Sequence, residues 1–150
     1  MVGSDGATYG EQVTDTDVRT RPLLVFDGDC AFCSTSVRWY ETRFPGAFVA
    51  VPYQRADLDV LGLTEDECHA RLQWVGDPTS PTTSRESGAR AVAALTRAGG
   101  RSRGGVVGWC WRAAATVTLV PPVSWLAEGV YRLVAANRRR LPGGTPACGL

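Results

Sequence analysis

The chain has 150 residues, of which 44% are hydrophobic and 21% charged, and its formal net charge is +1. This length and composition predict one folded domain with its own core and exclude a disordered chain. The small net charge argues against nucleic acid as a partner. The only locally basic run, residues 137–140, is too short to change this expectation. All sixteen basic residues are arginine, which excludes mechanisms that need a lysine and, with the abundant Ala, Gly and Val, suggests a GC-rich bacterial source.

The first residues differ in character from the rest. Residues 1–21 lack hydrophobic periodicity and predict a flexible leader, so that the folded domain covers residues 22–150. The leader has no charged segment followed by an apolar one, and we therefore expect a cytoplasmic protein without a secretory signal. Five cysteines are an odd number and are too dispersed for the disulfide framework of a small secreted domain.

The folded part begins with a strand, a tight turn and a helix. Residues 23–26 form a continuous apolar run, typical of a strand buried on both faces of a parallel sheet. After the turn, apolar residues recur at helical spacing to about Phe44, with Asp29 as the expected N-cap and Pro45-Gly46 as the stop. Residues 47–51 predict a second strand, parallel to the first because a helix connects them.

The middle of the chain predicts shorter elements. Residues 64–67 have the form of a capping box. The expected elements are helical pieces at 58–63 and 64–70, strands at 72–75 and 81–86, and a helix at 87–98.

The C-terminal third predicts two helices, 106–119 and 123–137, separated by Pro121-Pro122. Charged residues and the prolines interrupt the apolar pattern, so neither helix is expected to span a membrane. We expect the pair to cover the sheet. A peripheral membrane contact stays open as an alternative, through Trp109, Trp111, Trp125 and the arginine run.

Cys30 and Cys33 are the candidate reactive groups. They are spaced i and i+3, which allows a disulfide within one helical turn, and they follow a buried strand directly. At the start of a helix, unpaired backbone N–H groups and the helix dipole stabilise a thiolate. The sequence therefore predicts Cys30 as the nucleophile and Cys33, one turn further in, as the more buried resolving thiol.

The carboxylates of Asp27 and Asp29 oppose this stabilisation. A free thiol has a pKa of about 8.5, which a helix N-terminus can lower to roughly 3.5–7.5. Negative charges a few residues away disfavour the thiolate. We expect a moderate depression of the Cys30 pKa, as in a reductant rather than a strong oxidant.

Two other interpretations of the same segment compete. Cys30, Cys33, Cys68 and His69 could form a zinc site, which would make the protein a non-enzymatic zinc-binding or protein-interaction module, but a second CxxC or HxxxH motif is missing. Residues 24–29 resemble the strand and DxD motif of haloacid-dehalogenase-like phosphatases. Those enzymes use a downstream lysine, which this chain lacks.

The remaining candidate side chains receive no catalytic role. His69 is the single histidine, and Cys110, between two tryptophans, is expected to be a buried small hydrophobe. Cys148 lies in a Gly/Pro-rich tail where an accessory thiol is conceivable.

The segment 26–33 resembles the DCC family of thiol-disulfide oxidoreductases, whose signature is Asp-x-x-Cys-x-x-Cys; Asp27, Cys30 and Cys33 match it. The resemblance extends through three further segments and Cys148, and together they span residues 23–148. The segments are 51–54 with Pro-x-Gln, 87–90 with a serine and small residues, and 131–138 with Tyr and Asn-Arg.

This resemblance implies an α/β fold, a thioredoxin-like three-layer sandwich with additional C-terminal helices, and dithiol chemistry without a cofactor or metal. Cys30 would attack a disulfide in a protein or a small molecule, and Cys33 would resolve the mixed disulfide. Asp27 would orient Cys33 or relay its proton, or else cap the turn. The cis-proline that thioredoxin-like proteins place before the third strand is missing, since residues 67–70 precede Leu72. The physiological substrate and the direction of the reaction stay open.

Overall fold

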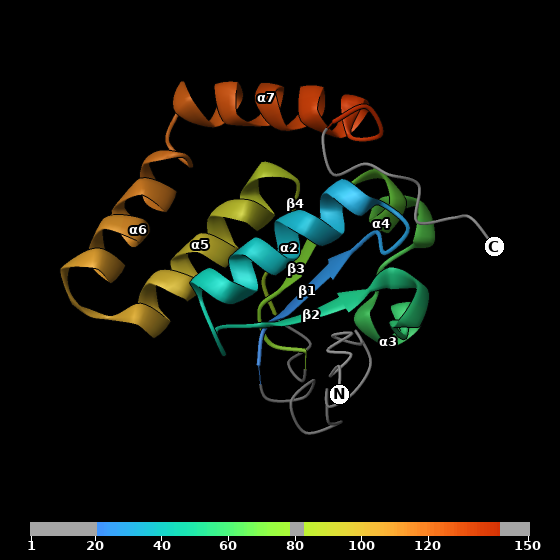
Figure 1. The fold of residues 1–150 in the computed structure, drawn as a ribbon, viewed down its shortest axis with the longest axis horizontal. Helices are drawn as coiled ribbons and strands as arrows, with labels where there is room; N and C mark the ends of the chain where they lie inside the picture. The colour runs from blue at the N-terminus through green and yellow to red at the C-terminus, as the bar shows by residue number, and fades with distance from the viewer. Residues whose placement is uncertain (1–20, 79–82, 142–150) are drawn as a thin grey trace, which may run out of the picture.

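The computed structural model describes residues 21–78 and 83–141 (Figure 1). The predicted leader, apart from Arg21, and Cys148 lie outside the described residues. In chain order the elements are β1 (Leu23–Phe26), α2 (Ala31–Arg43), β2 (Val49–Pro52), the 3-10 helix η1 (Tyr53–Arg55), α3 (Leu58–Leu61), α4 (Glu65–Ala70), β3 (Gln73–Val75), β4 (Arg85–Ser87), α5 (Ala89–Arg103), α6 (Gly105–Val117) and α7 (Val123–Asn137).

The sheet has the strand order β2-β1-β3-β4. β1 pairs in parallel with β2, as the helical connection predicts, and Leu23 lies opposite Val49. β3 runs antiparallel to β1, and β4 runs antiparallel to β3. β1 is therefore a central strand, which is why all four of its residues are apolar and buried.

Successive residues of β1 face opposite sides of the sheet. Leu24 and Phe26 belong to a core cluster that includes residues of α2 and α5. Leu23 and Val25 belong to a second cluster, with Leu61 of α3 and Cys68 of α4. Helices thus cover both faces, and the predicted α/β class, a thioredoxin-like three-layer sandwich with additional C-terminal helices, is confirmed.

Two helix boundaries differ from the sequence-based expectation. Asp29 is not the N-cap of α2, because Cys30 occupies that position. The helix expected at 87–98 instead runs from Ala89 to Arg103, through Gly99 and Gly100. A Cβ at Gly99 would overlap the ring of Phe44, so the glycine that suggests a helix end from sequence serves close packing within the helix.

The shorter elements agree more closely with the sequence. The capping box of α4 is present, with the Glu67 N–H donating to the Thr64 hydroxyl and the Glu67 carboxylate accepting from the Thr64 N–H. Hydrogen bonds that the Thr64 N–H and the Thr64 hydroxyl donate to the Glu67 carboxylate lower the pKa of Glu67. β4 begins at Arg85, and residues 81–82 of the expected strand lie outside the described part of the chain.

The two C-terminal helices do not cover the sheet directly, contrary to the expectation. α5 already packs on that face, and α6 and α7 lie outside it (Figure 1). α6 approaches α5 closely because Gly100 faces Gly108, where added Cβ atoms would collide with the opposing backbone. Cys110 of α6 is exposed rather than buried. Across the described residues, no helix has the length and apolarity to cross a membrane.

Candidate functional site

Cys30 and Cys33 lie at the junction of β1 and α2, as their spacing predicts. They form a disulfide with a Cα–Cα distance of 5.2 Å. The preceding turn needs a glycine, because a Cβ at Gly28 would lie 2.9 Å from the Pro52 side chain. The turn between β1 and α2 therefore packs against the end of β2 and places the dithiol at the start of α2.

The backbone of α2 distinguishes the two cysteines. Cys30 is the N-cap in an extended conformation, and its Sγ accepts a hydrogen bond from the Cys33 N–H at 3.2 Å. Both side chains are partly buried, so burial alone does not separate a nucleophile from a resolving thiol. An N-terminal helix N–H directed at sulfur favours negative charge on that sulfur, which is the Cys30 Sγ.

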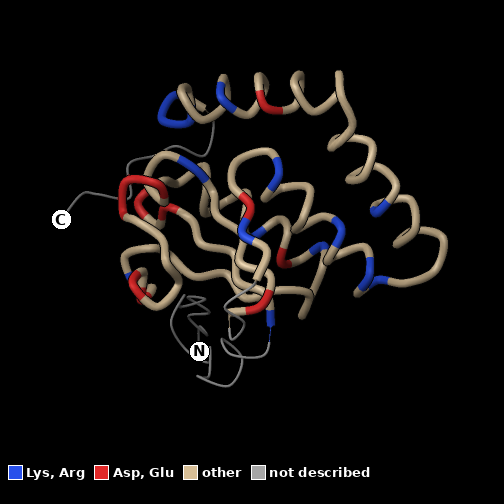
Figure 2. Tube along the Cα trace, turned by 180° about the vertical axis from the view of Figure 1, so that it is seen from behind, with Lys and Arg blue, Asp and Glu red and all other residues tan. Residues whose placement is uncertain are grey.

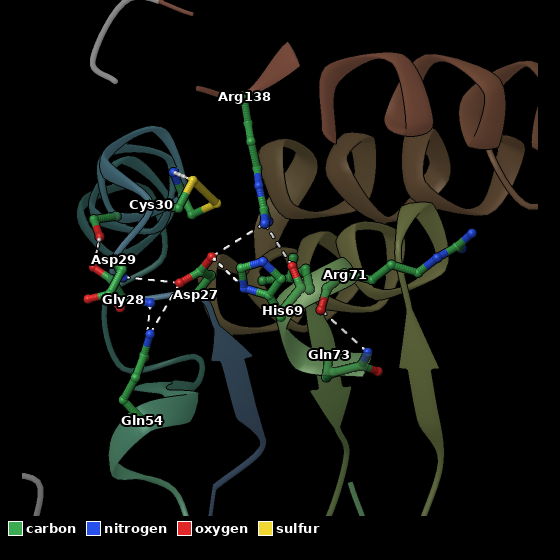
Figure 3. A network of polar contacts seen from close by, with 12 residues as sticks. Asp27, Gly28, Asp29, Cys30, Gln54, His69, Arg71, Gln73 and Arg138 are labelled. Carbon is green, nitrogen blue, oxygen red and sulfur yellow. Dashed lines mark hydrogen bonds and ion pairs between the residues drawn. A yellow bond between two sulfur atoms is a disulfide. The ribbon is translucent and has the colours of Figure 1, made fainter. Parts of the chain in front are cut away.

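Asp27 is buried directly before the dithiol, with 6% of its surface exposed. One carboxylate oxygen accepts from the Asp29 N–H at 3.1 Å and from the Gln54 amide at 3.2 Å (Figure 3). The other lies 3.5 Å from Nδ1 of His69 and 3.4 Å from the Arg138 guanidinium. Both oxygens are thus engaged by polar groups, three of which come from distant parts of the chain.

Gln54 and the main chain fix the shape of the turn. The Gln54 side-chain oxygen accepts from the Gly28 N–H at 3.2 Å while its amide donates to Asp27. The Cys30 N–H donates to the Asp27 carbonyl at 3.3 Å. Asp27 is therefore connected to Cys30 through the backbone of the turn, and η1 supplies the side chain that holds this turn.

Arg138, just after α7, connects the C-terminal region to the site. Its side chain is only 14% exposed and donates to the His69 carbonyl at 2.8 Å as well as pairing with Asp27. The Asn137-Arg138 segment resembles a family motif, but the sequence predicted no role for Arg138. The match of this segment to the family motif was the one sequence signal that pointed to Arg138. Its contact with Asp27 could not be predicted from spacing, because the two residues are far apart in the sequence.

Two more side chains of α7 attach it next to the same segment. The Tyr131 hydroxyl accepts from the Leu72 N–H at 2.9 Å, and Arg71 pairs with Glu128 at 2.6 Å. Partial burial opposes ionisation of Glu128, but hydrogen bonds from Arg132 and Arg71 outweigh it and lower the pKa. The attachment of α7 therefore lies beside the dithiol site.

The structure does not assemble the four-residue zinc set. Cys33 packs against the core cluster of α2 and α5, whereas Cys68 is buried in the cluster on the opposite face of the sheet. Burial raises the pKa of the Cys68 thiol to about 11. His69, half exposed, points to Asp27, a position that sequence analysis missed. Within residues 21–78 and 83–141, no three His, Cys, Asp or Glu side chains are grouped to hold a metal ion.

An apolar cavity of about 210 Å³ borders Cys33. Its walls come from β1, α2, α5 and α7, with Asp27 and Arg138 contributing polar groups; the apolar lining includes Phe26, Phe32, Val37, Leu95 and Val134. An apolar cavity of about 150 Å³ is large enough to bind benzene. The cavity can therefore accept an apolar group next to the dithiol.

Of the comparisons with known proteins, the one with protein families gives a match. A family model described as DCC1-like thiol-disulfide oxidoreductase matches residues 24–144. The match runs from β1 through α7 and includes Cys30, Cys33, Asp27, Gln54 and Arg138. No curated protein and no solved structure matches the chain.

Proposed function

Because the chain belongs to the DCC1-like thiol-disulfide oxidoreductase family, we propose that it exchanges thiols and disulfides through Cys30 and Cys33. The observation that carries this proposal is the N-cap position of Cys30, whose Sγ accepts the Cys33 N–H. In the reduced protein the same N–H would stabilise a Cys30 thiolate, the form that attacks disulfides. The pair is partly exposed, which leaves room for a substrate to approach.

The proposed reaction transfers two electrons from the dithiol to a substrate disulfide. The Cys30 thiolate attacks one substrate sulfur, forms a mixed disulfide and releases the other substrate sulfur as a thiolate, which takes up a proton. Cys33 then loses its proton and attacks the Cys30 Sγ. This step forms the Cys30–Cys33 disulfide and releases the second substrate thiol, so that the substrate is reduced and the protein is oxidised.

We assign Asp27 a positioning role rather than proton transfer. Its carboxylate already binds the Asp29 N–H, Gln54, His69 and Arg138, and it reaches Cys30 through the turn backbone. These contacts hold the turn between β1 and α2 in one conformation, and so fix the position of Cys30 at the start of α2. Asp27 also provides the buried negative charge that holds Arg138, and hence the end of α7, at the site.

The cavity beside Cys33 suggests which disulfides fit. An apolar group attached next to the substrate sulfur would fill space lined by Phe32, Val37 and Val134. Burying that group removes apolar surface from water and so strengthens binding. We therefore propose that disulfides with an adjacent apolar or aromatic group react in preference to small polar ones.

Single-cysteine variants test the assignment. Reduced Cys33→Ser, mixed with a small symmetrical disulfide such as hydroxyethyl disulfide, should accumulate a mixed disulfide at Cys30 that mass spectrometry detects. Cys30→Ser should react at Cys33 on the order of tenfold more slowly near neutral pH, because that thiol lacks the N-cap position. Cys110→Ser, at an exposed cysteine outside the site, is the matched control and should behave as the unmodified protein.

The contrary outcomes are specific. Faster trapping at Cys33 than at Cys30 would reverse the assignment of the nucleophile. Stoichiometric zinc bound to the purified protein and lost in both Cys30→Ser and Cys33→Ser would favour the zinc-binding module instead. Equal rates for all variants would show that the dithiol does not carry the reaction.

A further inference from the structure

The helices α6 and α7 and their connection expose an unusual amount of apolar surface. Among the described residues, most exposed large hydrophobic side chains lie in this region: Val106, Val107, Trp109, Val117, Val120, Val123, Trp125, Leu126, Val130 and Leu133. Trp109 is 65% exposed and Trp125 73%. Exposed hydrophobic residues are ordinary when scattered singly, but a concentration on adjacent helices marks an interaction surface.

The apolar surface continues inward between the helices. A cleft of about 550 Å³ lies between α5, α6 and α7, and its lining is mostly apolar, including Trp111, Ala114, Leu126 and Val130. α7 has no buried residue over its whole length. α6 packs on α5, but both α6 and α7 keep apolar groups exposed on their other sides.

The same region is basic. Residues 105–141, which comprise α6, the connection, α7 and the residues directly after α7, contain five arginines and one acidic residue, Glu128, a net charge of +4, so the rest of the chain carries −3. Figure 2 shows acidic residues concentrated around α3 and α4, whereas α6 and α7 carry few charged residues and a basic turn follows the end of α7. The exposed arginines of this region are Arg112, Arg132, Arg139 and Arg140, and the exposed Arg101 and Arg103 lie just before it in the last turn of α5.

We propose that α6 and α7 bind the surface of an anionic lipid membrane. Tryptophan favours the boundary between lipid headgroups and acyl chains, and arginine binds lipid phosphate. Basic residues near an anionic leaflet add an attraction that acts within a Debye length. Since no helix in the described part of the chain is long and apolar enough to span a bilayer, α6 and α7 would lie on the surface.

The positive charge of the region around α6 and α7 favours an anionic membrane over a second copy of the chain as the binding partner. Two copies meeting through the same helices would bring one region of net charge +4 against another, which costs electrostatic energy. An anionic membrane supplies the opposite charge. Because Arg138 connects the end of α7 to Asp27, membrane binding would also hold the dithiol site close to the lipid surface.

Vesicle co-sedimentation tests the proposal with the full-length protein. We expect binding to vesicles containing phosphatidylglycerol, weaker binding to phosphatidylcholine alone, and loss of binding as salt rises. The double variant Trp109→Ser/Trp125→Ser should bind on the order of tenfold more weakly, because it removes the two most amphipathic apolar groups. Trp39→Ser is the matched control, since Trp39 is 51% exposed on α2, and should bind normally.

Three results would overturn the proposal: no binding to phosphatidylglycerol vesicles, equal loss in the double variant and the Trp39→Ser control, or a dimer in solution that the double variant converts to monomer. Circular dichroism confirms that each variant remains folded. Membrane binding and thiol–disulfide exchange can be tested separately, because the double variant leaves Cys30, Cys33 and their contacts intact. Its rate with a small disulfide in solution should be unchanged whichever way the vesicle experiment ends.

Discussion

The sheet with its covering helices and the pair α6–α7 are held in place in different ways. In β1, every residue is at most 1% exposed and contacts apolar neighbours on both faces. α7 buries no residue completely, and the contacts that fix its end are polar: Arg71 with Glu128, Leu72 with Tyr131, and Asp27 with Arg138. The core therefore stabilises the first region, whereas the dithiol site itself supplies part of the attachment of the second.

The largest expected difference between the two regions comes from equivalent truncations of leucine. Leu24→Ala, at a fully buried position in β1, should lower the free energy of unfolding by about 2–5 kcal/mol through lost burial and the cavity it leaves. Leu133→Ala, at a position 66% exposed in α7, should change it by no more than about 0.5 kcal/mol. Urea unfolding followed by circular dichroism measures both. A comparable loss of stability in Leu133→Ala would show that Leu133 is buried in solution, and that α7 is held by apolar contacts as β1 is.

The next effect concerns the ion pair between the regions. Arg138→Gln should destabilise the protein by about 3 kcal/mol, because it leaves the buried Asp27 carboxylate without its main positive partner. Arg139→Gln, the adjacent exposed arginine, should change stability by less than about 0.5 kcal/mol. The dithiol exchange rate should fall in Arg138→Gln and not in Arg139→Gln. Equal behaviour of the two variants would mean that α7 is not attached through the site.

Structural features that depend on residues close together in the sequence were predictable, whereas features that depend on contacts between distant residues were not. The β1–α2 junction and the dithiol were predictable, because an apolar run, a turn and a helical repeat are local patterns. The continuation of α5 through Gly99 was not, since its cause is the ring of Phe44, and the exposure of Cys110 was not, since apolar flanks do not reveal which helix face has a partner.

The candidate site shows the same division. Asp27, Cys30 and Cys33 are adjacent in sequence and were identified together. Gln54 and Arg138 meet Asp27 only through the paired strands and the return of α7, and His69 meets it through α4. Their meeting depends on tertiary structure, which no spacing in a single sequence contains.

A smaller effect is expected from Tyr131→Phe. The change keeps the ring but leaves the Leu72 N–H without its acceptor, and should lower stability by about 1.5 kcal/mol. Hydrogen exchange provides a local measurement: the Leu72 amide should exchange faster, while amides in β1 keep their protection. Unchanged exchange at Leu72 would indicate that the end of α7 stays attached through Arg71 and Arg138 alone.

The smallest effect at neutral pH concerns Cys68 and Cys110, the cysteines outside the dithiol that the described residues include, one in each region. Burial raises the pKa of Cys68 to about 11, from 9.0, so its folded form keeps its proton where an unfolded chain would lose it. Its contribution to stability is therefore complete below about pH 9 and is lost as pH rises toward 11. In a Cys148→Ser background with the Cys30–Cys33 disulfide intact, iodoacetamide at pH 8 should modify the exposed Cys110 readily and Cys68 only on unfolding. Rapid modification of Cys68 in the folded protein would show that α4 opens away from the sheet, and that the first region is less tightly packed than its apolar contacts indicate.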